Sequence, residues 1–194
     1  MIILNIRNLI FRTKSKIFRE FFLFLKLRPS SYPYISCDGF RAIADHIYDD
    51  IKTFDPSIVK EGDIIFVQTH SIEEYFEKMH PLIDYRYKLI THNSDDDIGE
   101  EESKYLDKKI TRWFAQNNVF SHPKITPIPI GLENEKWVMT GYSLRRIVDR
   151  LRRESLVRKN KVLFGFNIKT NPKERTDAQE NLRKCSVADE IKQR

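Results

Sequence analysis

Apolar positions along this chain follow two alternating spacings between residues 32 and 130. Short runs rich in apolar residues predict strands at 63–68, 87–91, 112–116 and 125–130. Helical spacing predicts a helix from a cap at Asp38 to about Phe54, a second over 72–79, and a short one that follows acidic residues 95–102 and ends near Ile110. Strands that alternate with helices indicate an α/β fold, a Rossmann-like parallel sheet with helices on both faces.

A second pattern begins after residue 143. Apolar positions four residues apart predict a basic helix at 143–155, whose arginines favour a solvated face over nucleic-acid binding. The run 161–168 predicts a new strand, and Asn171 with Pro172 predicts the start of another helix. We therefore expect a basic N-terminal segment at 1–31, an α/β domain at 32–158, and the start of a further α/β domain at 159–194.

The N-terminal segment contains a predicted amphipathic helix at 15–28, which Pro29 ends. Its apolar face and its Lys and Arg residues are typical of a helix lying on an anionic membrane. They are also typical of a helix that packs on protein, which we favour. The chain has neither a secretory layout nor the roughly 20 apolar residues that cross a bilayer. We expect a cytoplasmic protein, with peripheral membrane contact through 15–28 as the open alternative.

Charge is distributed unevenly along the chain. The net charge is +6, yet residues 1–40 carry seven Lys or Arg against two acids, and residues 141–194 carry fifteen against seven, so the middle is acidic. Basic ends on an acidic body favour contacts with phosphates, anionic lipid or another domain, and we expect no nucleic-acid partner. The two cysteines, Cys37 and Cys185, lack the spacing of a disulfide framework or a zinc site.

Polar side chains follow three of the predicted strands, in segments 68–71, 91–95 and 129–134. The carboxyl ends of parallel strands meet at one edge of a sheet, which is where open α/β sheets bind ligands. Hydroxyl, amide, imidazole and carboxylate groups suit the recognition of sugar hydroxyls, although each segment alone also fits turn and capping residues. The candidate residues are His70, His92, Asn93, Ser94, Asp95, Gly131, Glu133 and Asn134.

Several familiar sites are missing from the sequence. It contains no phosphate-binding loop that ends in Gly-Lys-Ser/Thr, no Gly-rich dinucleotide turn and no helical zinc pair. The run Asp95–Asp97 could hold a divalent metal on a nucleotide, but acids continue to Glu102, which favours an exposed loop before a helix. We therefore expect no metal site.

A candidate anion site lies at 167–175. A predicted strand ends there, Thr170 or Asn171 can cap a helix, and Arg175 is one of three nearby cations. Free N–H groups and the dipole at a helix N-terminus attract phosphate, while a well-capped helix without a ligand remains the alternative. The candidate residues are Asn167, Thr170, Asn171 and Arg175.

Five segments together resemble the exostosin-like glycosyltransferases, which have the two-domain GT-B fold. They are 34–40, 89–95, 113–117, 128–134 with Trp137, and 166–175, so the resemblance spans about residues 32–184. The resemblance implies transfer of a sugar from a nucleotide-sugar donor to a glycan hydroxyl. It also implies that His92, Asn93 and Asp95 lie at the acceptor cleft, that Gly131, Glu133 and Asn134 lie at the interdomain face, and that Asn171 and Arg175 lie near the donor phosphates.

The chain departs from the family pattern in length. Only nineteen residues follow Arg175, fewer than a donor domain needs. We therefore expect an incomplete transferase, with no residue assigned as catalytic base. The alternative is a non-catalytic glycan-binding or interaction module derived from such an enzyme.

Overall fold

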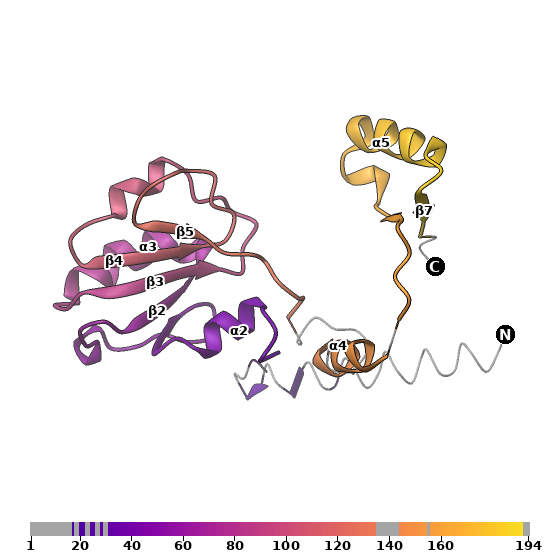
Figure 1. The fold of residues 1–194 in the computed structure, drawn as a ribbon. Coiled ribbons are helices and arrows are strands. Elements are labelled where there is room, and N and C mark those ends of the chain that lie inside the picture. The colour runs from indigo at the N-terminus through magenta and orange to yellow at the C-terminus, as the bar shows by residue number, and fades with distance from the viewer. Residues whose placement is uncertain are drawn as a thin grey trace. The chain divides into compact units, whose positions relative to one another are not determined.

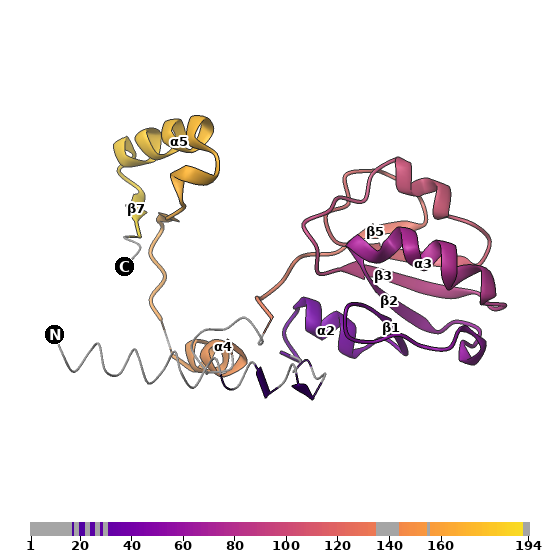
Figure 2. The same ribbon diagram turned by 180° about the vertical axis from the view of Figure 1, so that it is seen from behind.

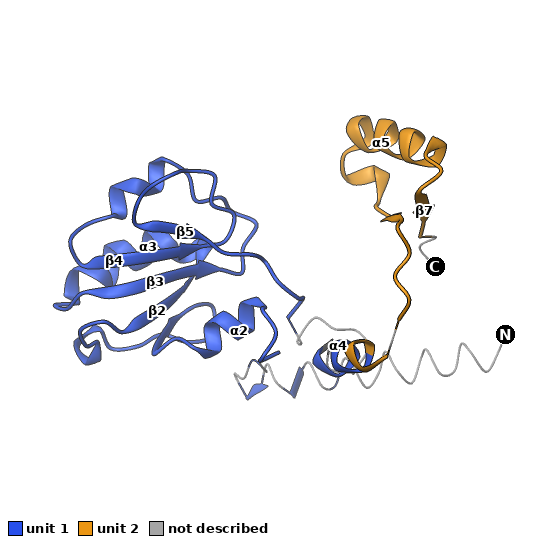
Figure 3. Cartoon of the chain, in the orientation of Figure 1, with its two compact units in different colours: residues 1–150 blue, residues 151–194 orange. Residues whose placement is uncertain are grey.

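The computed structural model describes residues 31–134, 144–154 and 156–191, together with six positions before them: Ile17, Glu20, Phe21, Phe24, Leu25 and Arg28. Residues 1–150 and 151–194 form two compact units (Figure 3). Most of the helix predicted at 15–28 lies outside the described residues. Among the helices that the structure describes, none is long and apolar enough to span a bilayer.

The first unit is built on a five-stranded parallel sheet (Figure 1). Its strands are β1 (His46–Tyr48), β2 (Ile64–Gln68), β3 (Tyr87–His92), β4 (Ile110–Ala115) and β5 (Ile125–Pro127), in the spatial order β1-β2-β3-β4-β5. Every neighbouring pair is parallel, so all five strands end at the same edge of the sheet. The sequence prediction of strands at 63–68, 87–91 and 112–116 is confirmed.

Helices cover both faces of this sheet (Figure 2). Alternate residues of β2 divide between the faces, because side chains of a strand point to opposite sides in turn. Ile65 and Val67 pack with Tyr75 of α3 (Ile72–Lys78) in the larger core. Phe66 packs instead with Cys37 of α2 (Cys37–Ala42) in a smaller core on the other face. The predicted α/β class and parallel sheet are confirmed, as is the helix predicted over 72–79.

The helix predicted from Asp38 to Phe54 is wrong beyond its first turns. Ser36 caps α2 by accepting a hydrogen bond from the Gly39 N–H at 2.9 Å, and Asp38 is buried inside the first turn. The helix ends at Ala42 because Asp45 binds the sheet: its N–H donates to the Ile64 carbonyl at 2.9 Å, and its carboxylate accepts from the Ile64 N–H at 2.8 Å. These bonds draw residues 46–48 into the sheet as the edge strand β1.

Two further boundaries differ from prediction. The acidic stretch after β3 leads into a 3₁₀ helix, η4 (Glu101–Tyr105), and β4 begins at Ile110, where the predicted helix was expected to end. Strand β5 ends at Pro127 instead of Ile130. The last bond of this ladder runs from the Ile128 N–H to the carbonyl of Ala115 at 3.0 Å, and β4 itself ends at Ala115, so β5 has no partner strand beyond this point.

The remaining connections of the first unit are short. They include the 3₁₀ helices η1 (Pro56–Ile58), η2 (Thr69–Ser71) and η3 (His80–Leu82). Helix α4 (Leu144–Arg153) confirms the prediction at 143–155 and contains the boundary between the two units.

The second unit is a βαβ arrangement. Strand β6 (Val162–Phe164) leads through η6 (Ile168–Thr170) to α5 (Pro172–Lys184), and β7 (Ala188–Glu190) then pairs with β6 in parallel. The helix predicted from Pro172 is confirmed, whereas the strand predicted over 161–168 is shorter. A two-stranded parallel sheet with Val162 and Leu163 exposed has little core of its own.

Candidate functional site

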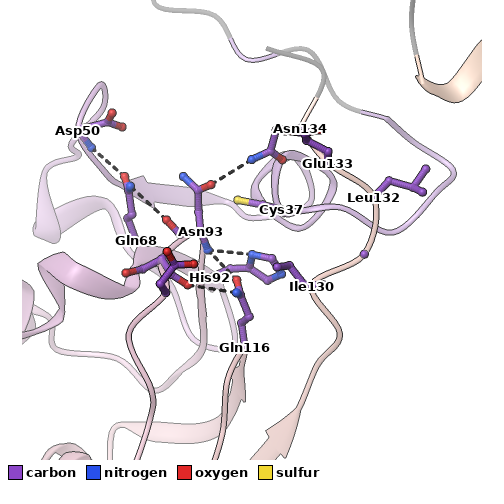
Figure 4. A pocket seen from close by; sticks show the side chains of 13 residues that line it. Cys37, Asp50, Gln68, His92, Asn93, Gln116, Ile130, Leu132, Glu133 and Asn134 are labelled. Atoms are coloured by element: carbon purple, nitrogen blue, oxygen red, sulfur yellow. Dashed lines mark hydrogen bonds between the residues drawn. The ribbon is translucent and has the colours of Figure 1, made fainter. Parts of the chain in front are cut away.

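A cavity of about 610 Å³ lies where β2, β3 and β4 end (Figure 4). One wall comes from these strand ends, and the other comes from residues 130–134 and the first turn of α2. The lining residues are Cys37, Asp50, Gln68, His92, Asn93, Ser94, Asp95, Gln116, Ile130, Gly131, Leu132, Glu133 and Asn134. Segments 91–95 and 129–134, which are far apart in the sequence, therefore meet as predicted.

The floor of the cavity contains His92, a buried histidine whose two ring nitrogens are both engaged. Its Nδ1 accepts a hydrogen bond from the Asn93 N–H at 2.8 Å, and its Nε2 lies 3.2 Å from the Pro129 carbonyl oxygen. Because a carbonyl can only accept, Nε2 carries the proton and the ring is neutral. Burial lowers the pKa of His92, which agrees with this neutral form.

Asn93 projects into the cavity from a left-handed backbone, with φ of 66°. The orientation of its amide follows from a backbone group. The Asp38 N–H can only donate, and it donates to Asn134 Oδ1 at 2.9 Å. Asn134 Nδ2 must therefore donate to Asn93 Oδ1, at 3.0 Å. This leaves Asn93 Nδ2 as a donor that has no protein acceptor among the described residues.

Two glutamines hold the Asn93 backbone in place. The Asn93 N–H also donates to Gln116 Oε1 at 3.0 Å, and Gln116 Nε2 donates to the Ser94 carbonyl at 3.1 Å. On the other side, Gln68 Nε2 donates to the Asn93 carbonyl at 3.3 Å. The side chains of Gln68, His92 and Gln116 lie next to one another at three adjacent strand ends, so the amide network is built into the sheet.

The second wall depends on a glycine. Gly131 has φ of 73°, and a Cβ at this position would lie 2.3 Å from the Ile35 carbonyl oxygen. The close approach allows the Leu132 N–H to donate to that same oxygen at 2.7 Å. Segment 130–134 is thereby fixed beside the entry to α2, where Asn134 reaches Asp38 and Asn93.

Three carboxylates line the cavity, and they come from Asp50, Asp95 and Glu133. Asp50 forms a short ion pair with Arg28, whose buried guanidinium also lies 3.8 Å from the carboxylate of Asp49. Asp95 and Glu133 are exposed and form no ion pair with any described Lys or Arg. The cavity is therefore rich in amides and acidic in charge.

Seven of the eight residues predicted for the acceptor site line the cavity. His92, Asn93, Ser94, Asp95, Gly131, Glu133 and Asn134 all line the cavity, and His70 does not. His70 lies in η2, exposed, because β2 ends at Gln68 and the chain turns away before it.

The prediction included Gln68 in segment 68–71 but chose His70 from that segment, and it did not name Gln116, Cys37 or Asp50 as site residues; all but His70 line the cavity. Alternation along the strands could have found the two glutamines, since Gln68 lies two residues after Phe66 and Gln116 two after Phe114, on the same face. Cys37 lies in α2 and Asp50 follows β1, and the sequence pattern predicted one helix over both elements, so neither residue was placed at the sheet edge.

Within the described residues, no group of three or more His, Cys, Asp or Glu is arranged to hold a metal ion. In the acidic run, the Ser94 hydroxyl donates to Asp96 at 2.6 Å. This carboxylate of the acidic run therefore accepts a hydrogen bond from within its own loop.

The four residues predicted to bind an anion gather in one turn of the second unit. Asn167 Oδ1 accepts from the Lys169 N–H at 3.0 Å, and its carbonyl accepts from Thr170 and from Arg175, both at 2.8 Å. Asn171 donates to Glu174 at 2.9 Å, and the Arg175 guanidinium lies 5.8 Å from the centre of the Phe166 ring. These hydrogen bonds hold the turn together, and its binding to the phosphates of a nucleotide-sugar donor stays a prediction.

Fold and site together define an α/β protein with a Rossmann-like parallel sheet and a polar cavity at the carboxyl edge. A scan against protein-family models finds no matching family, and a search of curated proteins finds no similar protein.

Proposed function

We propose that the first unit is the acceptor side of a glycosyltransferase of the exostosin-like, GT-B type, and that the cavity binds a glycan whose hydroxyl receives a sugar from a nucleotide-sugar donor. The observation that carries the proposal is the network of oriented amides at the sheet edge. Sugar hydroxyls both donate and accept hydrogen bonds, and they are recognised by side chains whose donors and acceptors are held in place. The amide of Asn93 is such a group, since Asn134 fixes it at 3.0 Å.

The same geometry narrows the search for a base. Both nitrogens of His92 are engaged, and the ring is neutral with its proton on the nitrogen that faces a carbonyl, so His92 serves to position Asn93. Asp95 and Glu133 are the lining carboxylates that have no described cationic partner. In this proposal one of these two accepts the proton of the attacking hydroxyl. The donor would be bound by the second unit, through Asn167, Thr170, Asn171 and Arg175.

Binding of a glycan panel to the purified chain tests the proposal. We expect binding that Asn93→Gly abolishes, because glycine suits the left-handed backbone and removes only the amide. The matched control is His70→Ala, which removes an exposed polar side chain from the end of the same sheet outside the cavity. Absence of glycan binding, or equal loss in both variants, would refute the acceptor role.

A transfer assay with nucleotide sugars separates the two functions left open by the sequence. Turnover that Asp95→Asn or Glu133→Gln removes, with glycan binding retained, supports the transferase. Glycan binding without turnover under any donor supports the alternative, a non-catalytic glycan-binding module.

A further inference from the structure

The charge of the cavity has consequences for the ligand. Its lining contains three carboxylates and, among the described residues, no Lys or Arg. This contrasts with the chain as a whole, whose net charge is +6. The acidic character therefore belongs to this part of the surface.

Two cations lie close to the carboxylates around Asp50, and neither offsets the charge of Asp95 or Glu133. Arg28 is buried, with its side chain 1% exposed, and its guanidinium is surrounded by Asp38, Asp49 and Asp50. Arg41 is directed to Asp49 at 2.7 Å. Asp50 is thus largely compensated, whereas Asp95 and Glu133 keep their charge facing the cavity.

The remaining hydrogen-bonding groups match a ligand that lacks negative charge. Asn93 Nδ2 supplies a donor, and the two carboxylates supply acceptors. A hydroxyl or an ammonium group can donate to a carboxylate, whereas the ionised group of a uronate, a sulfate ester or a phosphate ester offers only acceptors and a like charge. Like charges a few ångströms apart repel each other, and this repulsion weakens as salt is added.

We infer that the cavity selects an uncharged or amino-bearing glycan and rejects anionic ones, including the phosphates of a nucleotide. This inference rests on the proposed function, because it names the class of acceptor for the same site. It also assigns the nucleotide part of a donor to a position outside this cavity.

Three matched oligosaccharides test the inference, alike except that one position of the sugar carries a hydroxyl, an amine or a carboxylate. Calorimetric titration at low salt should show the carboxylate form binding about tenfold more weakly than the hydroxyl form. The amine form should bind at least as tightly as the hydroxyl form. The difference between the carboxylate and hydroxyl forms should shrink in about 0.5 M salt, where the Debye length is only a few ångströms.

A double variant, Asp95→Asn with Glu133→Gln, should bring the affinities of the carboxylate and hydroxyl forms together, because the new amide oxygens still accept hydrogen bonds but carry no charge. The control is Glu73→Gln with Glu77→Gln, two exposed acids of α3 that lie outside the cavity, which makes the same change in net charge. Equal or tighter binding of the carboxylate form, or unchanged discrimination in the Asp95/Glu133 variant, would overturn the inference and leave the proposed function standing. Failure of all three sugars to bind would instead reject the proposed function.

Discussion

Replacing Asn93 changes two properties at once, and two variants separate them. Asn93→Ala removes the amide and also places alanine at φ of 66°, where it lacks the polar side chain that lets asparagine tolerate a left-handed backbone. A left-handed backbone costs such a residue about 1–2 kcal/mol. Asn93→Gly removes the same amide but has no such cost.

The shared loss comes from Asn134, which is 7% exposed. Without Asn93 Oδ1, its Nδ2 loses the acceptor at 3.0 Å. Leaving a buried donor unsatisfied costs about 1–3 kcal/mol. We therefore expect a decrease in the free energy of unfolding of about 2–5 kcal/mol for the alanine variant. The glycine variant should lose about 1 kcal/mol less, after allowing for the greater freedom of glycine in the unfolded chain.

Urea unfolding followed by the fluorescence of Trp113 measures this difference. Trp113 is fully buried in the first unit, and Trp137→Phe makes it the only tryptophan of the chain. With a slope of about 2 kcal/mol per molar urea, the midpoints of the two variants should differ by about 0.5 M. Equal midpoints would refute the left-handed backbone at Asn93, and unfolding free energies unchanged from the unmodified chain would refute its bond to Asn134.

Three further predictions concern the same unit. Gly131→Ala would place a Cβ 2.3 Å from the Ile35 carbonyl oxygen and should destabilise the unit by about 2 kcal/mol or more. The same variant should speed hydrogen exchange of the Leu132 N–H, which donates to that oxygen, and unchanged exchange would contradict the close approach. Trp113→Phe removes the donor that lies 2.9 Å from the Thr91 hydroxyl and should lower the free energy of unfolding by about 1–3 kcal/mol, measured by thermal unfolding. Adding Thr91→Val to this variant should lower it little further, and additive losses would argue against the hydrogen bond. Burial lowers the pKa of His92, so the stability that its neutral form contributes is present above about pH 6.5 and is lost as pH falls through the lower folded-state pKa. His92→Asn should therefore make the melting temperature depend less on pH between pH 7.5 and 5, and an unchanged dependence would contradict a neutral buried ring.

Long buried elements were predictable because their local pattern matches their final environment. Strand β2 is apolar from Ile64 to Val67, and β3 and β4 each carry buried apolar residues, such as Leu89 and Trp113, among a few polar ones, so apolar-rich runs marked all three strands. The polar residues that follow β3 could be identified as site candidates for the same reason. Shorter elements carry less pattern, and the three-residue strand β1 was mistaken for helix because Ile43, Ile47 and Ile51 also fit a four-residue spacing.

The sequence by itself determined the parallel α/β architecture and placed most of the site residues at one edge, because strand and helix patterns are local and their alternation along the chain implies parallel strands. Only the tertiary structure decided that His70 lies outside the cavity, that His92 is a neutral positioning group, and which atom of Asn93 remains available. These outcomes depend on hydrogen bonds between distant segments, such as that from the Asp38 N–H to Asn134, ninety-six residues away. No spacing along the chain encodes the direction in which an amide donates, which the fold sets by placing a backbone N–H or carbonyl beside it.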